Sequence, residues 1–280
     1  MPISRLQICG LSRIFISTMA TVSAIAAFLE EFAPHRLAAE WDNVGLLVGD
    51  ARRTVEHVMT CLTVTPASVA EAVAQKAQLI VSHHPLLFTP VRRITADDTQ
   101  GRMLLDLIAA GIAVCSPHTA FDSARSGINQ RLAEGLGLAD VAPLVPDSVD
   151  PKLGTGRFGF PEGSATLTSI AARVKDFLNV PGVQLVGNSQ VPVRSVAIVC
   201  GSGGELLEAA RRAGCDCFVT GEAKLHTCLE AEAYSIGMIL AGHFASERFG
   251  VERLAELIAA QFRDLTVWPC RGERDPLRSM

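Results

Sequence analysis

Two histidine–carboxylate pairs with the same spacing are the residues of this chain best suited to chemistry. His118 and Asp122 lie four residues apart, and so do His243 and Glu247. Side chains four apart on a helical turn project from one face, so each pair can offer a ring nitrogen and a carboxylate oxygen to one metal ion. One such pair is weak evidence, but two in similar contexts indicate a metal site.

A histidine dipeptide extends this set of donors. His83-His84 follows the apolar run QLIVS, which reads as a buried strand. With the two pairs it makes four imidazoles and two carboxylates, a donor set that suits Zn, Fe or Mn and is too rich in nitrogen for calcium. Six side chains exceed one tetrahedral site, whereas two ions bridged by a carboxylate would use them all.

An internal repeat places these donors after strands. The run HVMTCLTV (57–64) aligns with SVAIVCGS (195–202) at an offset of 138 residues, and the same offset aligns 70–85 with 208–223. Both copies end on an apolar strand followed by His, three residues and a carboxylate, in 111–122 and 235–247. Each half therefore reads strand, helix, strand, helix, strand, which is the alternation typical of α/β proteins with parallel strands.

This pattern predicts the fold class and the place of the site. We expect two similar, interlocked α/β lobes that arose by internal duplication, with the site in the cleft between them. In open parallel sheets, ligand-binding groups gather beyond the carboxyl ends of the strands. The donors all stand directly after predicted strands, so both sets can converge on one cleft.

We divide the chain as follows. Residues 1–18 are expected to be an N-terminal extension without structural importance, with Met19 the true start, and 19–137 to form the first lobe, completed by 251–280. The Pro- and Gly-rich stretch 138–164 reads as a connecting loop, and 165–250 as the second lobe. The first helix is expected to begin at Ser23 as N-cap, and amphipathic helices are expected over 165–180 and 251–262.

Composition excludes several classes of protein. Hydrophobic residues make up 49% of the 280 residues and charged residues 19%, as in a globular protein rather than a disordered one. The net charge of −4, without any run of Lys or Arg, argues against binding to nucleic acid. No stretch is apolar enough for a membrane span. The eight cysteines form no CxxC pair, so we expect reduced, packed thiols and a cytoplasmic protein.

The motif TGEAKLH (220–226) offers two further candidates for catalysis. Glu222 and His226 either orient ligands and carry protons beside the metals, or belong to the N-terminus of a helix, where Glu is favoured anyway.

Four residues are candidates for substrate binding. Gly201 and Gly203 lie between a strand and a helix, where backbone N–H groups either receive an anion or merely form a tight turn. Asp42 and Asn43 either line the cleft or hold the turn of the WDNVG motif. We expect Trp41, beside them, to pack in the core rather than to stack on a ligand.

The order of the motifs resembles that of a known family. WDNVGLLVGD (41–50), SHHPLLF (82–88), HTAFDSARSGIN (118–129), GTGR (154–157), GSGG (201–204), TGEAKLH (220–226) and AGHFASE (241–247) occur in the order found in the GTP cyclohydrolase I type 2 homologues, the Nif-three-like proteins. The resemblance runs from about Ala24 to Arg253.

This resemblance implies a two-lobed α/β fold, a dinuclear metal centre and a ring-shaped homohexamer, a toroid built as a trimer of dimers. The implied metal ligands are His83, His84, His118, Asp122, His243 and Glu247. Glu247 would be a candidate bridge between the ions. The family often carries an aspartate where this chain has Thr63, so the role of that carboxylate is open here.

Two functions follow from these observations. The leading one is a metal-dependent hydrolase, in which one ion lowers the pKa of bound water and the other polarises the substrate. The family name suggests opening of the purine ring of GTP, but no motif here resembles a dedicated guanine pocket. The alternative is a non-catalytic metal-binding scaffold or regulatory protein, whose ions fasten the two lobes together.

Overall fold

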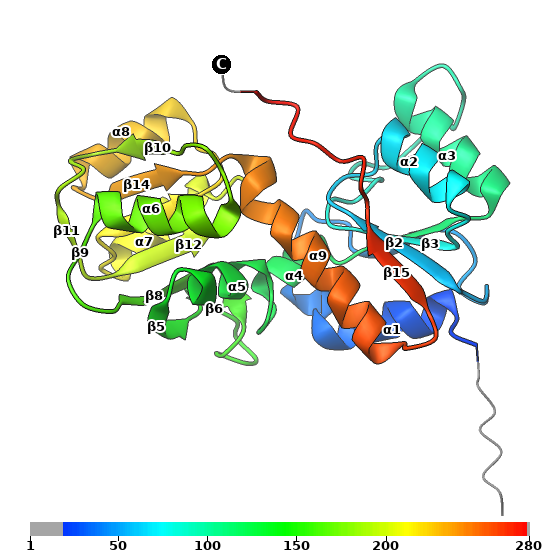
Figure 1. Ribbon diagram of the computed structural model, residues 1–280, viewed down its shortest axis with the longest axis horizontal. Coiled ribbons are helices and arrows are strands. Elements are labelled where there is room, and N and C mark those ends of the chain that lie inside the picture. Colours follow the sequence, from blue (N-terminus) through cyan, green and yellow to red (C-terminus); the bar gives the residue numbers. More distant parts are fainter. Residues whose placement is uncertain (1–18, 279–280) are drawn as a thin grey trace, which may run out of the picture.

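Two β-sheets flanked by helices form the two halves of the molecule in the computed structural model, which describes residues 19–278 (Figure 1). The alternation of strands and helices confirms the predicted α/β class. The predicted extension, residues 1–18, lies outside the described residues. No helix of residues 19–278 combines the length and the apolar composition that crossing a membrane requires.

The first sheet has five strands, four of them parallel. The N-terminal strand pairs antiparallel at one edge, and the last strand of the chain returns to the other edge. The strand order is β1 (Gly45–Val48), β4 (Ala113–Ser116), β3 (Leu79–Ser82), β2 (His57–Cys61) and β15 (Thr266–Pro269). Helices α2 (Pro66–Ala74) and α3 (Thr99–Ala110) connect the parallel strands.

The second sheet repeats the first four positions of this order and has two antiparallel strands where the first sheet has β15. Its order is β10 (Gln184–Val186), β14 (Gly237–Leu240), β13 (Cys217–Thr220), β12 (Val196–Val199), β8 (Arg157–Pro161) and β5 (Leu138–Ala142). Helices α7 (Leu207–Arg212) and α8 (Leu225–Ala233) make the parallel crossovers, and α6 (Leu167–Leu178) precedes β10. In each half three parallel strands are linked by helices, as the sequence repeat predicts: β2, β3 and β4 in the first and β12, β13 and β14 in the second. The antiparallel strand beside each set, β1 or β10, was not predicted, and the duplication itself stays a prediction.

One long helix joins the halves. α9 (His243–Gln261) runs from the end of β14 across the middle of the molecule to β15 (Figure 1). It packs on β2 and β15 of the first sheet and on α5 (Ile128–Gly135) and α6. Leu254 and Ile258 on this helix are fully buried in a core that also contains Val58 of the first sheet and Val196 of the second. The lobes are therefore interlocked through a common core.

Three boundaries differ from the prediction. Residues 138–164 contain two strands of the second sheet, β5 and β8, and the short pair β6 (Val145–Pro146) and β7 (Gly154–Thr155), so they are not a simple connecting loop. The expected helix 251–262 begins eight residues earlier, at His243, so the division at 250/251 cuts a continuous helix.

The first helix, α1 (Val22–Phe32), also starts earlier than expected. Thr21, not Ser23, is its N-cap, because the Thr21 hydroxyl accepts a hydrogen bond from the N–H of Ala24 at 3.2 Å. Ser23 lies inside the first turn instead, where its hydroxyl contacts that of Thr21 at 2.9 Å.

The segment after β15 is held to α2 by one carboxylate. Glu71 accepts hydrogen bonds from Trp268 Nε1 at 3.2 Å and from the backbone N–H groups of Arg271 and Gly272 at 3.1 and 3.0 Å. The thiol of Cys270 donates to the same carboxylate at 3.3 Å. The pKa of Glu71 is low, because these bonds outweigh the effect of burial, which by itself would raise it. The seven cysteines of the described chain are free thiols.

We expect Glu71→Ala to lower the free energy of unfolding by about 1–3 kcal/mol, because donors at the end of β15 lose a charged acceptor. Urea denaturation measures this change. Glu31→Ala, on an exposed position of α1, is the matched control and should leave the stability within about 0.5 kcal/mol of the wild type. Equal stability of the two variants would show that Glu71 does not hold the C-terminal strand.

Candidate metal centre

The six predicted metal ligands lie together where α9 meets the ends of the parallel strands. Glu247 is the point of contact: one of its carboxylate oxygens lies 3.0 Å from His84 Nε2 and 3.1 Å from His243 Nε2. Its other oxygen lies 3.7 Å from His83 Nε2, which is itself 3.6 Å from an Asp122 oxygen.

Two groups of these side chains could hold metal ions. The first is formed by His83, His84 and His118, and the second by His84, His243 and Glu247; within each group the donor atoms lie within 4.8 Å of one another. His84 belongs to both groups. Two neighbouring ions are therefore compatible with the arrangement of the donors.

Each donor is positioned by the end of a strand or the start of a helix. The backbone N–H groups of His83 and His84 bond to the carbonyls of Cys61 and Leu62 at 2.9 and 2.8 Å, which continues the β2–β3 pairing past the last residue of β3. His118 and Asp122 lie on the short helix α4 (His118–Ser123) after β4. His243 and Glu247 occupy the first turns of α9. Their four-residue spacing places both side chains on one face of the helix, as predicted.

Three of the four imidazoles are oriented through Nδ1 by another side chain. Asp42 lies 2.7 Å from His118 Nδ1, Glu222 lies 3.0 Å from His243 Nδ1, and the hydroxyl of Thr63 lies 2.7 Å from His84 Nδ1. The carboxylates of Asp42 and Glu222 can only accept, so they favour a proton on Nδ1, and the Thr63 hydroxyl is also able to accept one. A ring with its proton on Nδ1 has a lone pair on Nε2 for a metal. At position 63, where the family often has an aspartate, the threonine hydroxyl contacts Nδ1 of His84 and orients its ring.

His83 has no such partner. Its side chain is fully buried, and both of its ring nitrogens lack a hydrogen-bond partner, as does Oδ1 of Asp122 nearby. Buried polar atoms without partners cost free energy, and a cation between a neutral imidazole and a carboxylate removes that cost. The donor set thus fits a divalent ion.

The ionisation of these groups reflects their crowding. Burial lowers the pKa of His83 to about 4, so this ring is neutral at pH 7. Burial and the charge of Glu247 raise the pKa of Asp122 well above its ordinary value. Burial would also raise the pKa of Glu247, but the surrounding histidines outweigh it and hold that pKa well below the ordinary range. The bond to Glu247 raises the pKa of His243 to about 9.

Two glycines let the loops approach this carboxylate. Gly201 has φ +67°, and a Cβ placed there would lie 2.0 Å from Oε1 of Glu247. A Cβ on Gly221 would lie 2.5 Å from the hydroxyl of Ser246, which accepts the N–H of Gly201 at 3.0 Å. Only glycine fits where the turn after β12 touches the start of α9.

The glycine turn is therefore not the anion site that we considered. The N–H of Gly201 is bonded to Ser246, and that of Gly203 is bonded to Thr220 Oγ1 at 3.1 Å. Both donors are used inside the protein, as expected for the alternative of a tight turn. Gly203 lines the cavity beside the predicted metal ligands, but its backbone N–H is bonded to Thr220 and is not free to bind a ligand there.

Of the two roles considered for Asp42 and Asn43, their hydrogen bonds agree with holding the WDNVG turn: the N–H of Asn43 bonds to Asp42 Oδ1 at 2.7 Å, and neither residue lines the cavity beside the predicted metal ligands. The Asp42 side chain is buried and bonds to His118 and to the backbone and hydroxyl of Thr119, which holds its pKa at about 2 against the opposing effect of burial. It orients His118, a predicted ligand, and its own carboxylate is closed off from solvent. Asn43 donates from Nδ2 to the carbonyl of Leu87 at 2.6 Å and so ties two loops together.

The two candidate residues of the motif TGEAKLH, Glu222 and His226, lie in different surroundings. Glu222 is the orienting residue for His243, one of the two roles considered for it. His226 is exposed on α8 and does not line the cavity that holds the metal ligands, so the structure gives no support for a catalytic role. Trp41, expected in the core, is 57% exposed and lines this cavity.

Two residues that the sequence analysis did not single out fasten α4 to the second half. Asn129 donates to the carbonyl of Asp122 at 3.1 Å and accepts from the N–H of Cys200 at 2.8 Å. Arg157 is buried and donates to the carbonyls of Ala124 and Gly156 at 2.6 and 2.7 Å. Burial lowers the pKa of Arg157 to about 10, so it remains a cation at the end of α4. The motifs HTAFDSARSGIN and GTGR contained both residues, but no spacing revealed their contacts.

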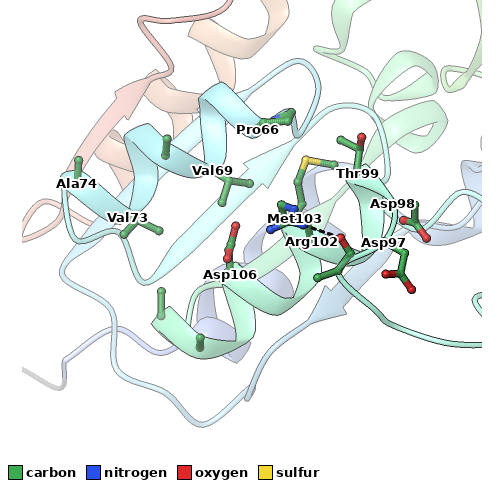
Figure 2. A pocket seen from close by; sticks show the side chains of 14 residues that line it. Pro66, Val69, Val73, Ala74, Asp97, Asp98, Thr99, Arg102, Met103 and Asp106 are labelled. Atoms are coloured by element: carbon green, nitrogen blue, oxygen red, sulfur yellow. Dashed lines mark hydrogen bonds between the residues drawn. The ribbon is translucent and has the colours of Figure 1, made fainter.

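A cavity of about 550 Å³ opens onto the predicted metal ligands. His84, His118, Asp122, His243 and Glu247 line it together with Trp41 and Phe88. A larger groove of about 810 Å³ lies between α2 and α3 (Figure 2), but none of the predicted site residues lines it. Two of its charged side chains serve local structure: Asp98 caps α3, and Arg102 donates to the carbonyl of Ala96.

Comparison with known proteins agrees with this architecture. The chain is 34% identical to a protein of Clostridium acetobutylicum named GTP cyclohydrolase 1 type 2 homolog, over 81% of this chain and 85% of the relative. A Streptomyces coelicolor protein of the same name is 33% identical over 92% of this chain and 94% of its own.

Solved structures share the fold. A Staphylococcus aureus hypothetical protein superposes with a TM-score of 0.85 at 27% identity, with 93% of this chain and 99% of that one covered. A Bacillus cereus protein related to NIF3 gives a TM-score of 0.86 at 23% identity, with 94% and 100% covered. Residues 20–276 match the family described as Duf34/NIF3 (NGG1p interacting factor 3), and the chain belongs to this family.

Proposed function

We propose that this chain is a metal-dependent hydrolase that holds two divalent ions in the cluster around Glu247. The observation that carries the proposal is the buried His83: both of its ring nitrogens lack a hydrogen-bond partner, although Nε2 lies 3.6 Å from an Asp122 oxygen and 3.7 Å from a Glu247 oxygen. His83, His84, His118, Asp122, His243 and Glu247 would hold the ions. Imidazole and carboxylate donors favour Zn, Fe or Mn.

Bound divalent ions supply Lewis acidity and lower the pKa of coordinated water. The residues of the chain prepare the site for that chemistry. His83 is neutral at pH 7 and offers a lone pair without losing a proton. Asp42, Glu222 and Thr63 hold the protons of the other three rings on Nδ1, away from the cluster.

The name shared by the relatives refers to GTP, but the cavity offers little to a triphosphate. No lysine or arginine occurs among the described residues that line it, whereas Asp122, Glu205 and Glu247 do. Several phosphate charges would need cationic partners. We therefore propose a small substrate with one metal-binding group. The homohexameric ring and the cytoplasmic location stay predictions.

The first test is the metal content of the chain and its dependence on Glu247. We expect about two ions per chain by elemental analysis of protein purified without added metal. Glu247→Ala should lose at least one ion and the hydrolytic activity found in a screen of phosphoesters and nucleotides, because the carboxylate contacts both ligand groups.

Glu256→Ala, at an exposed position of the same helix, is the matched control and should retain both ions and the activity. A wild-type chain without metal would refute the proposal. Bound metal with activity unaffected by Glu247→Ala would instead favour the scaffold alternative, in which the ions fasten the two halves.

The second test concerns Thr63. We expect Thr63→Val to weaken the binding of one ion about tenfold, because valine cannot accept the Nδ1 proton of His84 when Nε2 binds metal. Competition with a chromophoric chelator measures both affinities. Thr63→Ser retains the hydroxyl and should bind both ions as the wild type does. If valine and serine behaved alike, the contact between Thr63 and His84 would have no part in metal binding.

The third test uses pH. In the metal-free chain the pKa of His243 is about 9, above its ordinary value of 6.5. Protonated His243 thus contributes stability that is complete below pH 6.5 and is lost as the pH rises through 9. A bound ion replaces this proton. The Tm difference between metal-loaded and metal-free protein should therefore widen from pH 6.5 to 9.

Thermal unfolding at several pH values measures this difference, with His226→Gln as the control for an exposed histidine outside the cluster. A constant difference between the two forms over that range would contradict the link between metal binding and the proton on His243.

A further inference from the structure

Two exposed aromatic rings stand at the edge of the cavity that contains the metal ligands. Trp41 is 57% exposed and Phe88 is 52% exposed, and their ring centroids lie 5.6 Å apart at an angle of 43°. Both approach His118 edge-on, with centroid distances of 6.0 and 6.3 Å. The rings thus form one apolar surface next to a ligand that faces the cluster.

Hydrogen bonds of the neighbouring residues hold the backbone that carries these two rings, although the rings themselves are exposed. The residue after Trp41 is Asp42, whose buried carboxylate is bonded to His118 and Thr119. The next residue, Asn43, donates to the carbonyl of Leu87, which directly precedes Phe88. The two loops are therefore linked to each other and to the metal ligand. Preorganised, exposed aromatic side chains are typical of binding sites.

The charges of the cavity indicate which part of a ligand goes where. Its described lining has acidic side chains and histidines but no lysine or arginine, so an anionic group can be neutralised only at the metals. The lining also has uncharged polar side chains such as Thr155 and Ser202, but the rings of Trp41 and Phe88 are its largest exposed apolar groups, so an apolar part of a ligand is best held by them. The volume of about 550 Å³ is in the range of sites for small molecules.

We propose that Trp41 and Phe88 form a stacking surface for a planar aromatic ring of the substrate, which carries one oxygen-bearing anionic group that reaches the metal ligands. This proposal rests on the proposed function, because it assumes that ions occupy the cluster. A nucleobase with a single phosphate and a simple aromatic acid share this chemistry.

The test compares matched probes on zinc-loaded protein by calorimetry. Adenosine 5′-monophosphate is compared with ribose 5-phosphate, and benzoate with cyclohexanecarboxylate, so that each pair differs in the planar ring. We expect the ring-bearing probe of at least one pair to bind about tenfold more tightly or better, since stacking of one ring is worth about that factor. The pair that shows the preference identifies the source of the ring.

Variants test whether Trp41 and Phe88 cause the tighter binding of the ring-bearing probes. Trp41→Ala and Phe88→Ala should each reduce it at least about threefold, and Trp41→Phe should keep most of it. Tyr234→Ala, which removes an aromatic side chain that is 43% exposed at the C-cap of α8, should leave it unchanged. Ring binding should also quench the fluorescence of Trp41. Trp41→Phe should abolish this quenching, because the only other tryptophan, Trp268, is 9% exposed and does not contact the ligand.

Metal content is measured on every variant, so that the two proposals fail separately. A wild-type chain that binds no zinc would refute the proposed function. A zinc-loaded chain that binds both members of each pair equally would refute only the stacking surface. If Trp41→Ala instead dissociates an oligomer, seen by sedimentation, and no ring preference exists, the rings are a contact between copies of the chain and the proposal is wrong.

Discussion

A single buried carboxylate among histidines is the constraint on which this structure depends. Glu247 is 4% exposed, and three imidazoles surround it: His83 and His84 from the end of β3, and His243 from its own helix. Burying a charge is costly unless it is paired, so the histidines must come to Glu247 or the carboxylate must leave the core. The position of α9 and the ends of β3 and β14 are therefore tied to one another.

The backbone around Glu247 is built to permit this crowding. Gly201 takes a left-handed conformation so that its turn can pass the carboxylate, and Gly221 makes room for Ser246. His118 itself has φ +24°, a strained value for a residue with a side chain. Such strain is held by surrounding contacts, here the bonds of Asp42 to His118 and Thr119.

Hydrogen bonds between the two halves and from the C-terminal residues fix the segments that carry the clustered histidines and carboxylates. Arg157 and Asn129 bind the end of α4 to the second half. From the other side, the C-terminal segment reaches the loop after β2: Glu273 accepts the N–H groups of Leu62 and Thr63 at 2.9 and 2.8 Å and lies 3.5 Å from Arg248. The residue that orients His84 is thus anchored by the far end of the chain.

Much of this arrangement could be predicted because it is local. The apolar runs determine where the parallel strands lie, and the spacing of His118 from Asp122 and of His243 from Glu247 places each pair on one helical face, since the geometry of a helical turn does not depend on distant residues. The strand-then-histidine order also identified the edge of each sheet where the candidate residues come together.

What the sequence could not determine depends on segments far apart in the chain. The pairing of Asp42 with His118 spans 76 residues and that of Leu62 with Glu273 spans 211, and no periodicity encodes such contacts. The same holds for β5 and β8, whose Pro- and Gly-rich surroundings read as a loop, and for Trp41, whose exposure depends on which loops cover it. Sequence spacing fixes donors along one element, whereas only packing decides which elements meet and which side chains remain open.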